Sequence, residues 1–219
     1  MPSKKLKTPL IPGSYYHIYN RGNNREKLFY HNNDYYYFLT KYKQIVAPTV
    51  NTYAFCLMPN HFHFLISVKG ERENKKMTTS NQLRKLFIMY TQRINSLQQR
   101  SGSLFTKNFQ RIEVKDLFYL KTLVIYIHRN PIRHGLMIDF QNYNFSSMDS
   151  YISNKSTQLL KSEVIEWFGG KEEFLTNHFS TDESQPEYDV HYLEEDGVPG
   201  SEMESLPDES KLNLSTAFF

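Results

Sequence analysis

The chain has 219 residues, 39% of them hydrophobic and 15% aromatic, which suggests one compact domain or one domain with an appendage. Its net charge of +3 combines +13 in residues 1–180, from 25 Lys and Arg against 12 Asp and Glu, with −10 in residues 181–219. Cys56 is the only cysteine, which excludes an intrachain disulfide and a cysteine-based zinc site, and no apolar run is long enough to span a membrane.

The basic residues 1–180 indicate a phosphate-rich partner such as nucleic acid, although a basic solvated surface without a partner gives the same composition. The first residues contain no long apolar stretch and predict no secretory signal. A single cysteine fits a reducing compartment. We therefore expect a cytoplasmic protein that binds nucleic acid and has no membrane partner.

Alternating aromatic and β-branched residues predict strands, and apolar residues at a spacing of 3.6 predict helices. The turn-forming residues of RGNNRE, at 21–26, separate the first strand from the first helix. The predicted strands are 14–20, 50–58, 61–68 and 111–114, and the predicted helices are 33–46, 79–99 and 116–130.

Capping and breaking residues set the ends of the predicted helices. Asn33 or Asp34 is the expected cap of the first helix, and Asp116 is the expected cap of the last. Pro131 predicts the end of that last helix, because the residue before a proline disfavours the helical region.

The order of these elements predicts the fold class. A tight turn at Pro59 and Asn60 joins two strands into a hairpin, which excludes a purely parallel sheet. We expect an α+β fold of the ferredoxin-like kind, in which an antiparallel sheet carries helices on one face.

The stretch MPNHFHFLI, residues 58–66, places two histidines one residue apart in an apolar run. Side chains of a strand alternate between faces, so His61 and His63 share one face and Phe62 and Phe64 share the other. Two neutral imidazoles at this spacing can occupy two positions around one divalent cation. A pair of surface or hydrogen-bonded histidines is the plainer interpretation of the strand pattern alone.

The segment YIHRNP, residues 126–131, offers a nucleophile. Tyr126 and Asn130 are four residues apart and share one face of a helix. A phenol has a pKa near 10 in water, so its attack on a phosphate needs a metal or a basic group that neutralises the phosphate. The product is a covalent phosphotyrosine, and the amide oxygen of Asn130 can supply a third metal ligand. Composition does not select Tyr126 from sixteen tyrosines, and a tyrosine on the rim of the core is the alternative.

Four segments of the chain resemble the REP-associated tyrosine transposases. They follow the expected order and spacing from about residue 14 to about residue 152, and they are YHIYNRGNNRE, AFCLMPNHFHFLI, NFQRIEVKD and YIHRNPIRHGLM. That group is part of a wider transposase family with one catalytic tyrosine and a His–hydrophobic–His motif.

The resemblance implies a ferredoxin-like sheet with the histidine pair on a central strand and the tyrosine on a neighbouring helix. It implies cleavage of single-stranded DNA, often near a hairpin, with Mg²⁺ or Mn²⁺. By motif it assigns His61 and His63 as metal ligands and Tyr126 as the nucleophile that forms a 5′-phosphotyrosine. Asn130 stands where related enzymes carry a polar helix ligand. His17, on the first strand, either faces the same site or is a core-edge histidine.

The segment 21–26 resembles the family's Asn-Arg-Gly motif. Turn amides and guanidinium groups suit phosphate or base contacts, while Asn-stabilised turn structure without a DNA role explains the same residues. The candidate DNA-binding residues are Arg21, Asn23 and Arg25 in this turn and Lys107, Arg111, Arg129 and Arg133 elsewhere, some of which we expect to be solvated charges only.

The resulting division of the chain is a basic, loosely ordered arm at 1–13, a transposase catalytic domain at 14–155, a C-terminal helical extension at 156–180 and an acidic tail at 181–219. Residues 162–179 predict two short helices separated by a Gly–Gly break, and the composition of the tail predicts disorder.

The leading hypothesis is a metal-dependent enzyme that nicks and joins single-stranded or hairpin DNA, as a monomer or a homodimer. One alternative is a non-catalytic regulator that binds hairpin DNA or RNA, and another is a rolling-circle initiator or relaxase. The joint presence of both histidines, Tyr126 and Asn130 favours an active enzyme, and the short chain without a helicase segment favours a transposase.

Overall fold

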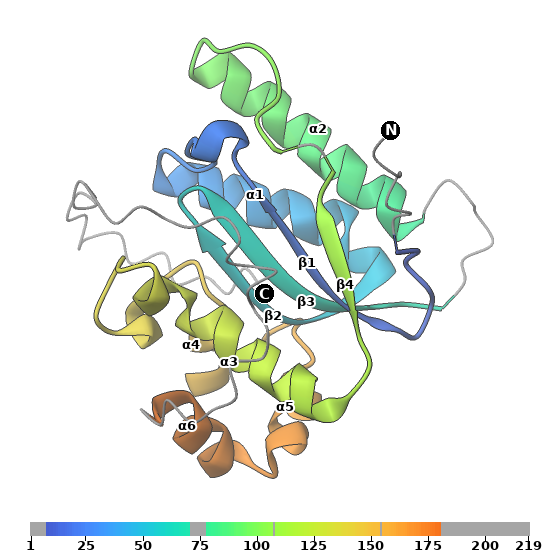
Figure 1. Ribbon diagram of the computed structural model, residues 1–219, viewed down its shortest axis with the longest axis vertical. Coiled ribbons are helices and arrows are strands. Elements are labelled where there is room, and N and C mark those ends of the chain that lie inside the picture. The colour runs from blue at the N-terminus through green and yellow to red at the C-terminus, as the bar shows by residue number, and fades with distance from the viewer. Residues whose placement is uncertain (1–7, 71–77, 107, 154, 181–219) are drawn as a thin grey trace, which may run out of the picture.

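A four-stranded antiparallel sheet organises the chain (Figure 1). The computed structural model describes residues 8–70, 78–106, 108–153 and 155–180. Neighbouring strands follow the order β2-β3-β1-β4, and each pair is antiparallel. The strands are β1 (Tyr15–Arg21), β2 (Val50–Met58), β3 (His61–Val68) and β4 (Gln110–Val114).

Two helices cover one face of the sheet, α1 (Asn32–Ile45) and α2 (Thr79–Leu97) (Figure 1). Phe62 and Phe64 of β3 point to this face. Phe62 contacts Phe38 of α1 and Phe87 of α2, with ring centroids 5.4 and 5.6 Å apart respectively. The alternation of strand, helix, hairpin, helix and strand is the ferredoxin-like βαββαβ order, so the predicted α+β class and antiparallel sheet are confirmed.

The helices do not all lie on one face, which corrects the predicted layering. Helix α3 (Leu117–Arg133) packs on the opposite face, against β2 and β3. Every residue of β3 after His61 is buried, so both faces of this central strand need a covering layer. Helix α3 supplies the second layer over the face that carries the histidines.

Helix α3 also runs past the predicted boundary, because Pro131 lies inside it. A proline inside a helix removes the hydrogen bond that its N–H would donate, and its ring crowds the carbonyl of residue i−4. Helix α3 continues for only two residues beyond Pro131. The end of the helix is closed by the N–H of His134, which donates to Asn130 O at 3.0 Å, and by the N–H of Leu136, which donates to Pro131 O at 2.8 Å. The extra residues place Arg133 and His134 near the face of the helix that carries Tyr126.

Three short helices follow and pack beside α3, namely α4 (Met148–Ile152), α5 (Lys161–Phe168) and α6 (Lys171–Phe179). Gly169 and Gly170, both with positive φ, separate α5 from α6, as the sequence predicted. Trp167 of α5 stacks on Tyr53 of β2 with ring centroids 5.0 Å apart. The C-terminal helices are therefore docked on the body. The shorter 3₁₀ turns are η1 (Asn23–Arg25), η2 (Ala47–Thr49) and η4 (Phe140–Asn142).

Part of the predicted basic arm is held against the sheet. The hydroxyl of Tyr16 donates to Pro9 O at 2.9 Å, and the N–H of Gly13 donates to Val68 O at 2.8 Å. Residues 1–7 and the acidic tail at 181–219 lie outside the described residues. No helix within the described ranges is long and apolar enough to cross a bilayer.

Candidate active site

Strand β3 presents the two motif histidines to the α3 side of the sheet. His61 and His63 share this face, with ring centroids 5.2 Å apart, and Phe62 and Phe64 point to the α1 side. His63 is buried and His61 is partly buried. The predicted alternation along this strand is confirmed.

His17 faces the same site, which decides between its two interpretations. Its Nε2 lies 2.9 Å from Nδ1 of His63, and its ring is fully buried. Burial lowers the pKa of His17 to about 3 and the pKa of His63 well below its usual value, so both rings are neutral at pH 7. When His63 donates its Nδ1 proton to His17, the Nε2 of His63 keeps a lone pair that can bind a cation.

His61 and Asn130 bring two acceptor atoms together. Nδ1 of His61 lies 2.7 Å from Oδ1 of Asn60, an acceptor, so this nitrogen carries the ring proton and Nε2 carries a lone pair. The amide nitrogen of Asn130 donates to Tyr126 O at 2.9 Å, which turns its Oδ1 toward His61 Nε2 at 3.5 Å. Burial lowers the pKa of His61 to about 3, so its ring is neutral at pH 7 and holds a single proton. In this arrangement two lone pairs face each other, which suits a shared cation.

Tyr126 lies beside the imidazoles of its own chain. Its ring is buried, with its centroid 5.5 Å from that of His63 and 6.3 Å from that of His17, both in edge-to-face geometry. The guanidinium carbon of Arg133 lies 5.2 Å from the centre of the Tyr126 ring. A phenol, a cation and the imidazole cluster are therefore adjacent.

The sequence analysis missed a further imidazole near the site. The ring of His134 lies 4.6 Å from that of His61, centroid to centroid. It follows Asn130 by four residues, a spacing that indicates a shared helix face once α3 is known to continue past Pro131. The error over the end of the helix concealed this signal.

The residues at this site fit a divalent metal of mixed nitrogen and oxygen preference. His61 Nε2 and Asn130 Oδ1 are close enough to contact one ion at bond lengths of about 2.1 Å. Within the described ranges, no three His, Cys, Asp or Glu side chains converge as a metal site. His61 and His63 share one face of β3, and Asn130 Oδ1 faces His61 Nε2; their role as metal ligands stays a prediction.

The turn that carries Arg21, Asn23 and Arg25 adjoins this site. Arg21 pairs with His61 across β1 and β3, and the N–H of Gly22 donates to Asn60 O at 2.7 Å. A side chain at Gly22 would bring its Cβ to 1.9 Å from Glu26 O, so only glycine fits there. Arg25 has a left-handed φ of 61°, a conformation that needs support from its surroundings.

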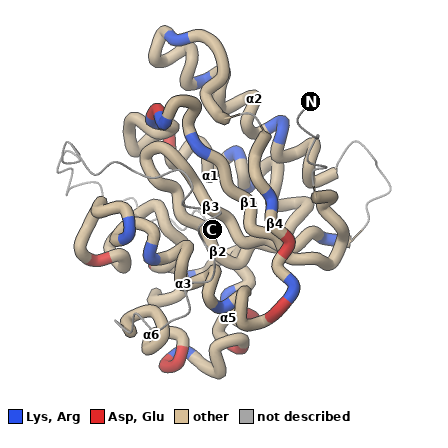
Figure 2. Tube along the Cα trace, viewed as in Figure 1, with Lys and Arg blue, Asp and Glu red and all other residues tan. Residues whose placement is uncertain are grey.

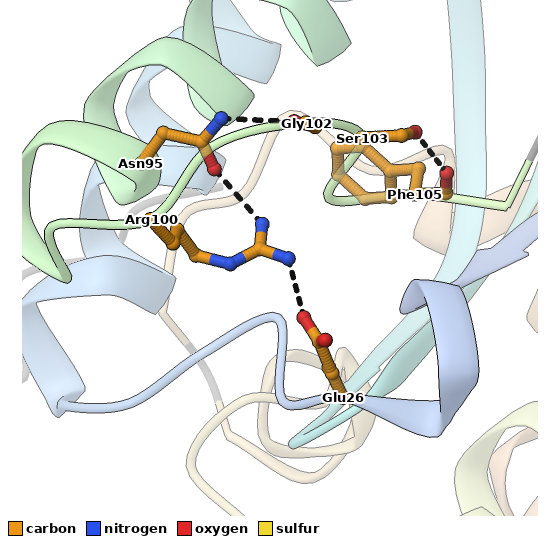
Figure 3. A network of polar contacts seen from close by, with 6 residues as sticks. All are labelled: Glu26, Asn95, Arg100, Gly102, Ser103 and Phe105. Atoms are coloured by element: carbon orange, nitrogen blue, oxygen red, sulfur yellow. Dashed lines mark hydrogen bonds and ion pairs between the residues drawn. The ribbon is translucent and has the colours of Figure 1, made fainter.

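Arg100 supplies part of that support from the segment after α2 (Figure 3). Its guanidinium group pairs with the Glu26 carboxylate and donates to Asn95 Oδ1 at 2.8 Å. The amide of Asn95 in turn donates to Gly102 O at 2.9 Å. The N–H of Asn23 donates to Leu104 O at 2.9 Å. The turn at 21–26 is therefore bonded to the segment after α2 near its start, through Asn23, and at its end, through Glu26.

The remaining basic candidates lie apart from the imidazoles. Arg111 is on the α1 side of the sheet, where it donates to Ser80 of α2 at 3.2 Å. Arg129 donates to Ser180 O at 3.0 Å, on the α6 side of α3. Lys107 lies outside the described residues. Lys and Arg are distributed over elements on both faces of the sheet (Figure 2).

Comparison with known proteins gives the chain a family. A family model described as IS200-like transposase matches residues 11–130, which is more than half of the chain. The chain belongs to this transposase family. A search of curated protein sequences found no match.

Eight chains of solved structures are also similar to this member of the IS200-like transposases. One of them is described as a REP-associated tyrosine transposase bound to a REP hairpin. It is 14% identical in sequence, the similarity covers 69% of this chain and 86% of that chain, and the TM-score is 0.56. This likeness confirms the fold. The family match begins before β1 and ends at Asn130, so it includes every strand of the sheet and the Tyr126 segment of α3.

Proposed function

We propose that this member of the IS200-like transposase family cleaves single-stranded, hairpin-containing DNA and rejoins it through a 5′-phosphotyrosine at Tyr126. The observation that carries the proposal is the contact of Tyr126 with His63, next to the facing acceptors of His61 and Asn130. A nucleophile and a cation site that share one phosphate are what phosphoryl transfer requires.

The chemistry conserves the phosphodiester bond energy. The phenol oxygen of Tyr126 bonds to phosphorus, and the bond from phosphorus to the 3′ oxygen breaks. The phenol loses its proton, and the 3′ oxygen takes up a proton and leaves as a hydroxyl. Attack by a second 3′ hydroxyl reverses the step and restores Tyr126. No nucleotide cofactor is needed, because each step exchanges one phosphate ester for another.

The residues of the chain divide this work. His61, His63 and Asn130 would hold Mg²⁺ or Mn²⁺, which would supply positive charge beside the scissile phosphate. His17 fixes the tautomer and ring orientation of His63. Arg133, over the Tyr126 ring, stabilises negative charge that develops between the phenol oxygen and the phosphate.

DNA contacts beside the site are assigned to the turn. Arg21 lies next to His61, and the exposed Arg25 projects from a turn that Gly22 and Arg100 hold in one conformation. A rigid turn with guanidinium groups suits recognition of unpaired bases or phosphates beside a hairpin. Arg111 and Arg129, which pack elsewhere, are assigned no contact at the cleavage site.

Covalent trapping tests the proposal. Labelled single-stranded hairpin DNA from the flanks of the gene is incubated with the protein and Mn²⁺, or with EDTA, and separated on a denaturing gel. We expect a metal-dependent protein–DNA band that Tyr126→Phe abolishes, because the ring stays while the nucleophilic oxygen is lost. Tyr119→Phe, at the start of the same helix, is the matched control and should keep the band.

The result also separates the enzyme from a binding-only regulator. A band that persists in Tyr126→Phe shows that another group is the nucleophile. Tight hairpin binding without any band in the wild type contradicts the proposal and favours the non-catalytic function.

A further inference from the structure

A buried polar chain lies behind the helix that carries Tyr126. His128 is two residues from both Tyr126 and Asn130, so it projects from the opposite side of α3. Its Nδ1 lies 2.9 Å from Nε2 of His178 in α6, and its Nε2 lies 2.8 Å from Oγ of Ser147. Each of these three side chains is buried.

The hydrogen bonds in this chain can run in only one direction when both rings are neutral, as their burial favours. Nδ1 of His178 lies 2.7 Å from Phe174 O, which only accepts, so that nitrogen carries the proton and Nε2 accepts. His128 must then donate from Nδ1 and accept at Nε2. Ser147 donates its single hydroxyl proton to His128 at 2.8 Å in preference to Phe55 O, which lies 3.2 Å from the same oxygen. Both rings are therefore Nδ1–H tautomers.

The hydrogen-bonded series of His178, His128 and Ser147 joins three layers of the molecule. At one end Ser147 accepts from the N–H of Phe55 in β2 at 2.9 Å, which anchors it to the sheet. At the other end His178 belongs to α6, and Arg129 of α3 adds a second bond to that helix through Ser180 O. Helix α3 is thus hydrogen-bonded between the sheet and α6, at a residue between the proposed nucleophile and the proposed metal ligand.

The C-terminal helices lie beyond the part of the chain that the family model describes. The match ends at Asn130, whereas α6 begins at Lys171. Hydrogen bonds between buried rings are directional, so they add a constraint on the rotation of α3 to the constraint from apolar packing. A rotation of α3 would move Tyr126 and Asn130 together relative to His61 and His63.

We propose that His178, acting through His128, is a positioning residue that sets the rotation of α3 and so aligns Tyr126 with the proposed metal site. The inference rests on the proposed role of Tyr126. It gives the C-terminal extension a part in the reaction although no residue of α6 contacts the imidazole cluster among the contacts described.

The test compares two substitutions at one position. His178→Phe keeps a ring but cannot accept from His128, whereas His178→Gln can place an acceptor near the former Nε2. Single-turnover formation of the covalent adduct is measured with saturating hairpin DNA and Mn²⁺, at a temperature where circular dichroism shows both variants folded. We expect about a 10- to 100-fold slower step in His178→Phe, hairpin affinity unchanged within about twofold, and recovery in His178→Gln.

Ser147→Ala provides a second variant should His178→Phe fail to fold. It removes the donor at the other end of the chain and should slow the same step without changing hairpin affinity. A purely structural role predicts lower thermal stability with unchanged rates for the folded variants, and that result overturns the inference.

A spectroscopic measurement tests the geometry without DNA or metal. Nitrogen-15 NMR should show His128 and His178 as Nδ1–H tautomers, and a proton on Nε2 of either ring overturns the inference by itself. Failure of the proposed function is distinct, since it appears as the absence of any adduct in the wild type. Failure of this inference appears as a wild-type adduct that forms equally fast in His178→Phe.

Discussion

Two clusters of buried histidines lie on opposite sides of α3 in the part of the chain that the structure describes, and they differ in how many of their nitrogen atoms have hydrogen-bond partners. Behind the helix, both nitrogens of His128 and both nitrogens of His178 have a partner. On the sheet side, Nδ1 of His17 has no hydrogen-bond partner, and His61 Nε2 faces another acceptor. Burial of imidazole is common to both, so burial does not identify a functional site. The two clusters differ in hydrogen bonding: on the sheet side His17 Nδ1 keeps an N–H without a partner, and His61 Nε2 keeps a lone pair that is available to a ligand.

The largest expected difference between the clusters concerns metal. His61→Ala and His63→Ala should each lower the rate of metal-dependent adduct formation at least about 100-fold, since a bound ion contributes several kcal/mol to the transition state. They should also abolish the rise in melting temperature that Mn²⁺ produces in the wild type. His178→Gln is the matched control on the other cluster and should keep that rise. If His178→Gln loses the Mn²⁺-induced rise in melting temperature as fully as His61→Ala and His63→Ala do, the rise does not come from Mn²⁺ bound on the sheet side of α3.

A smaller effect is expected at His17, which contacts the proposed ligand and not the ion. His17→Ala removes the partner that orients His63, and we expect Mn²⁺ affinity to fall about 10- to 100-fold. Mn²⁺ electron paramagnetic resonance measures the free ion directly. His17→Gln, which can keep an acceptor near Nε2, should lose less. An unchanged Mn²⁺ affinity in His17→Ala would show that His17 does not orient a metal ligand.

The smallest expected effect is one that the clusters share, a dependence of stability on pH. Burial lowers the pKa of His178 to about 4 and that of His17 to about 3, from about 6.5 in an unfolded chain. Between these values the unfolded state binds more protons. The stability is therefore complete above about pH 6.5 and is lost as the pH falls toward 4 and 3.

Urea unfolding at pH 7.5 and pH 5 measures this loss, which we expect to be about 1–2 kcal/mol for each buried histidine. His178→Gln has one titrating group fewer and should lose about 1–2 kcal/mol less than the wild type over the same interval. An identical loss in the two proteins would show that His178 titrates alike in the folded and unfolded states.

Local patterns predicted most of the fold. Strand β2 has the bounds that its alternation predicted, and the two short C-terminal helices meet at the predicted Gly–Gly break. The predicted end of α3 at Pro131 was wrong. The rule used concerns only the residue before a proline, and it cannot show that the residues after Pro131 close the helix with other hydrogen bonds. That one error hid His134 from the analysis of the site.

The site was predictable where chemistry and periodicity coincide, as in the shared face of His61 and His63. The partners of His17 and His128 were not, because they come from residues 46 and 50 positions away along the chain. Strand parity does place Arg111 on the phenylalanine face, but only once the register of β4 against β1 is known. The remaining predicted contacts of Arg21, Asn23, Arg25 and Arg133 with DNA stay predictions.

The separation of the layers along the chain has a consequence for biosynthesis. All four strands are complete at Val114, whereas the contacts that close the second face include Tyr151 with Tyr53 and Glu163 with Tyr15. At a synthesis rate of about 5–20 residues per second, the segment from Val114 to Ser180 takes about 3–13 s to make. Helix α3 can cover part of β2 and β3 once Arg133 is made, but the part of this face that Tyr151 and α5 cover stays exposed for longer. The second face is therefore closed only after α4 and α5 are made, and we expect chaperones that bind apolar surface to contact the nascent chain until then.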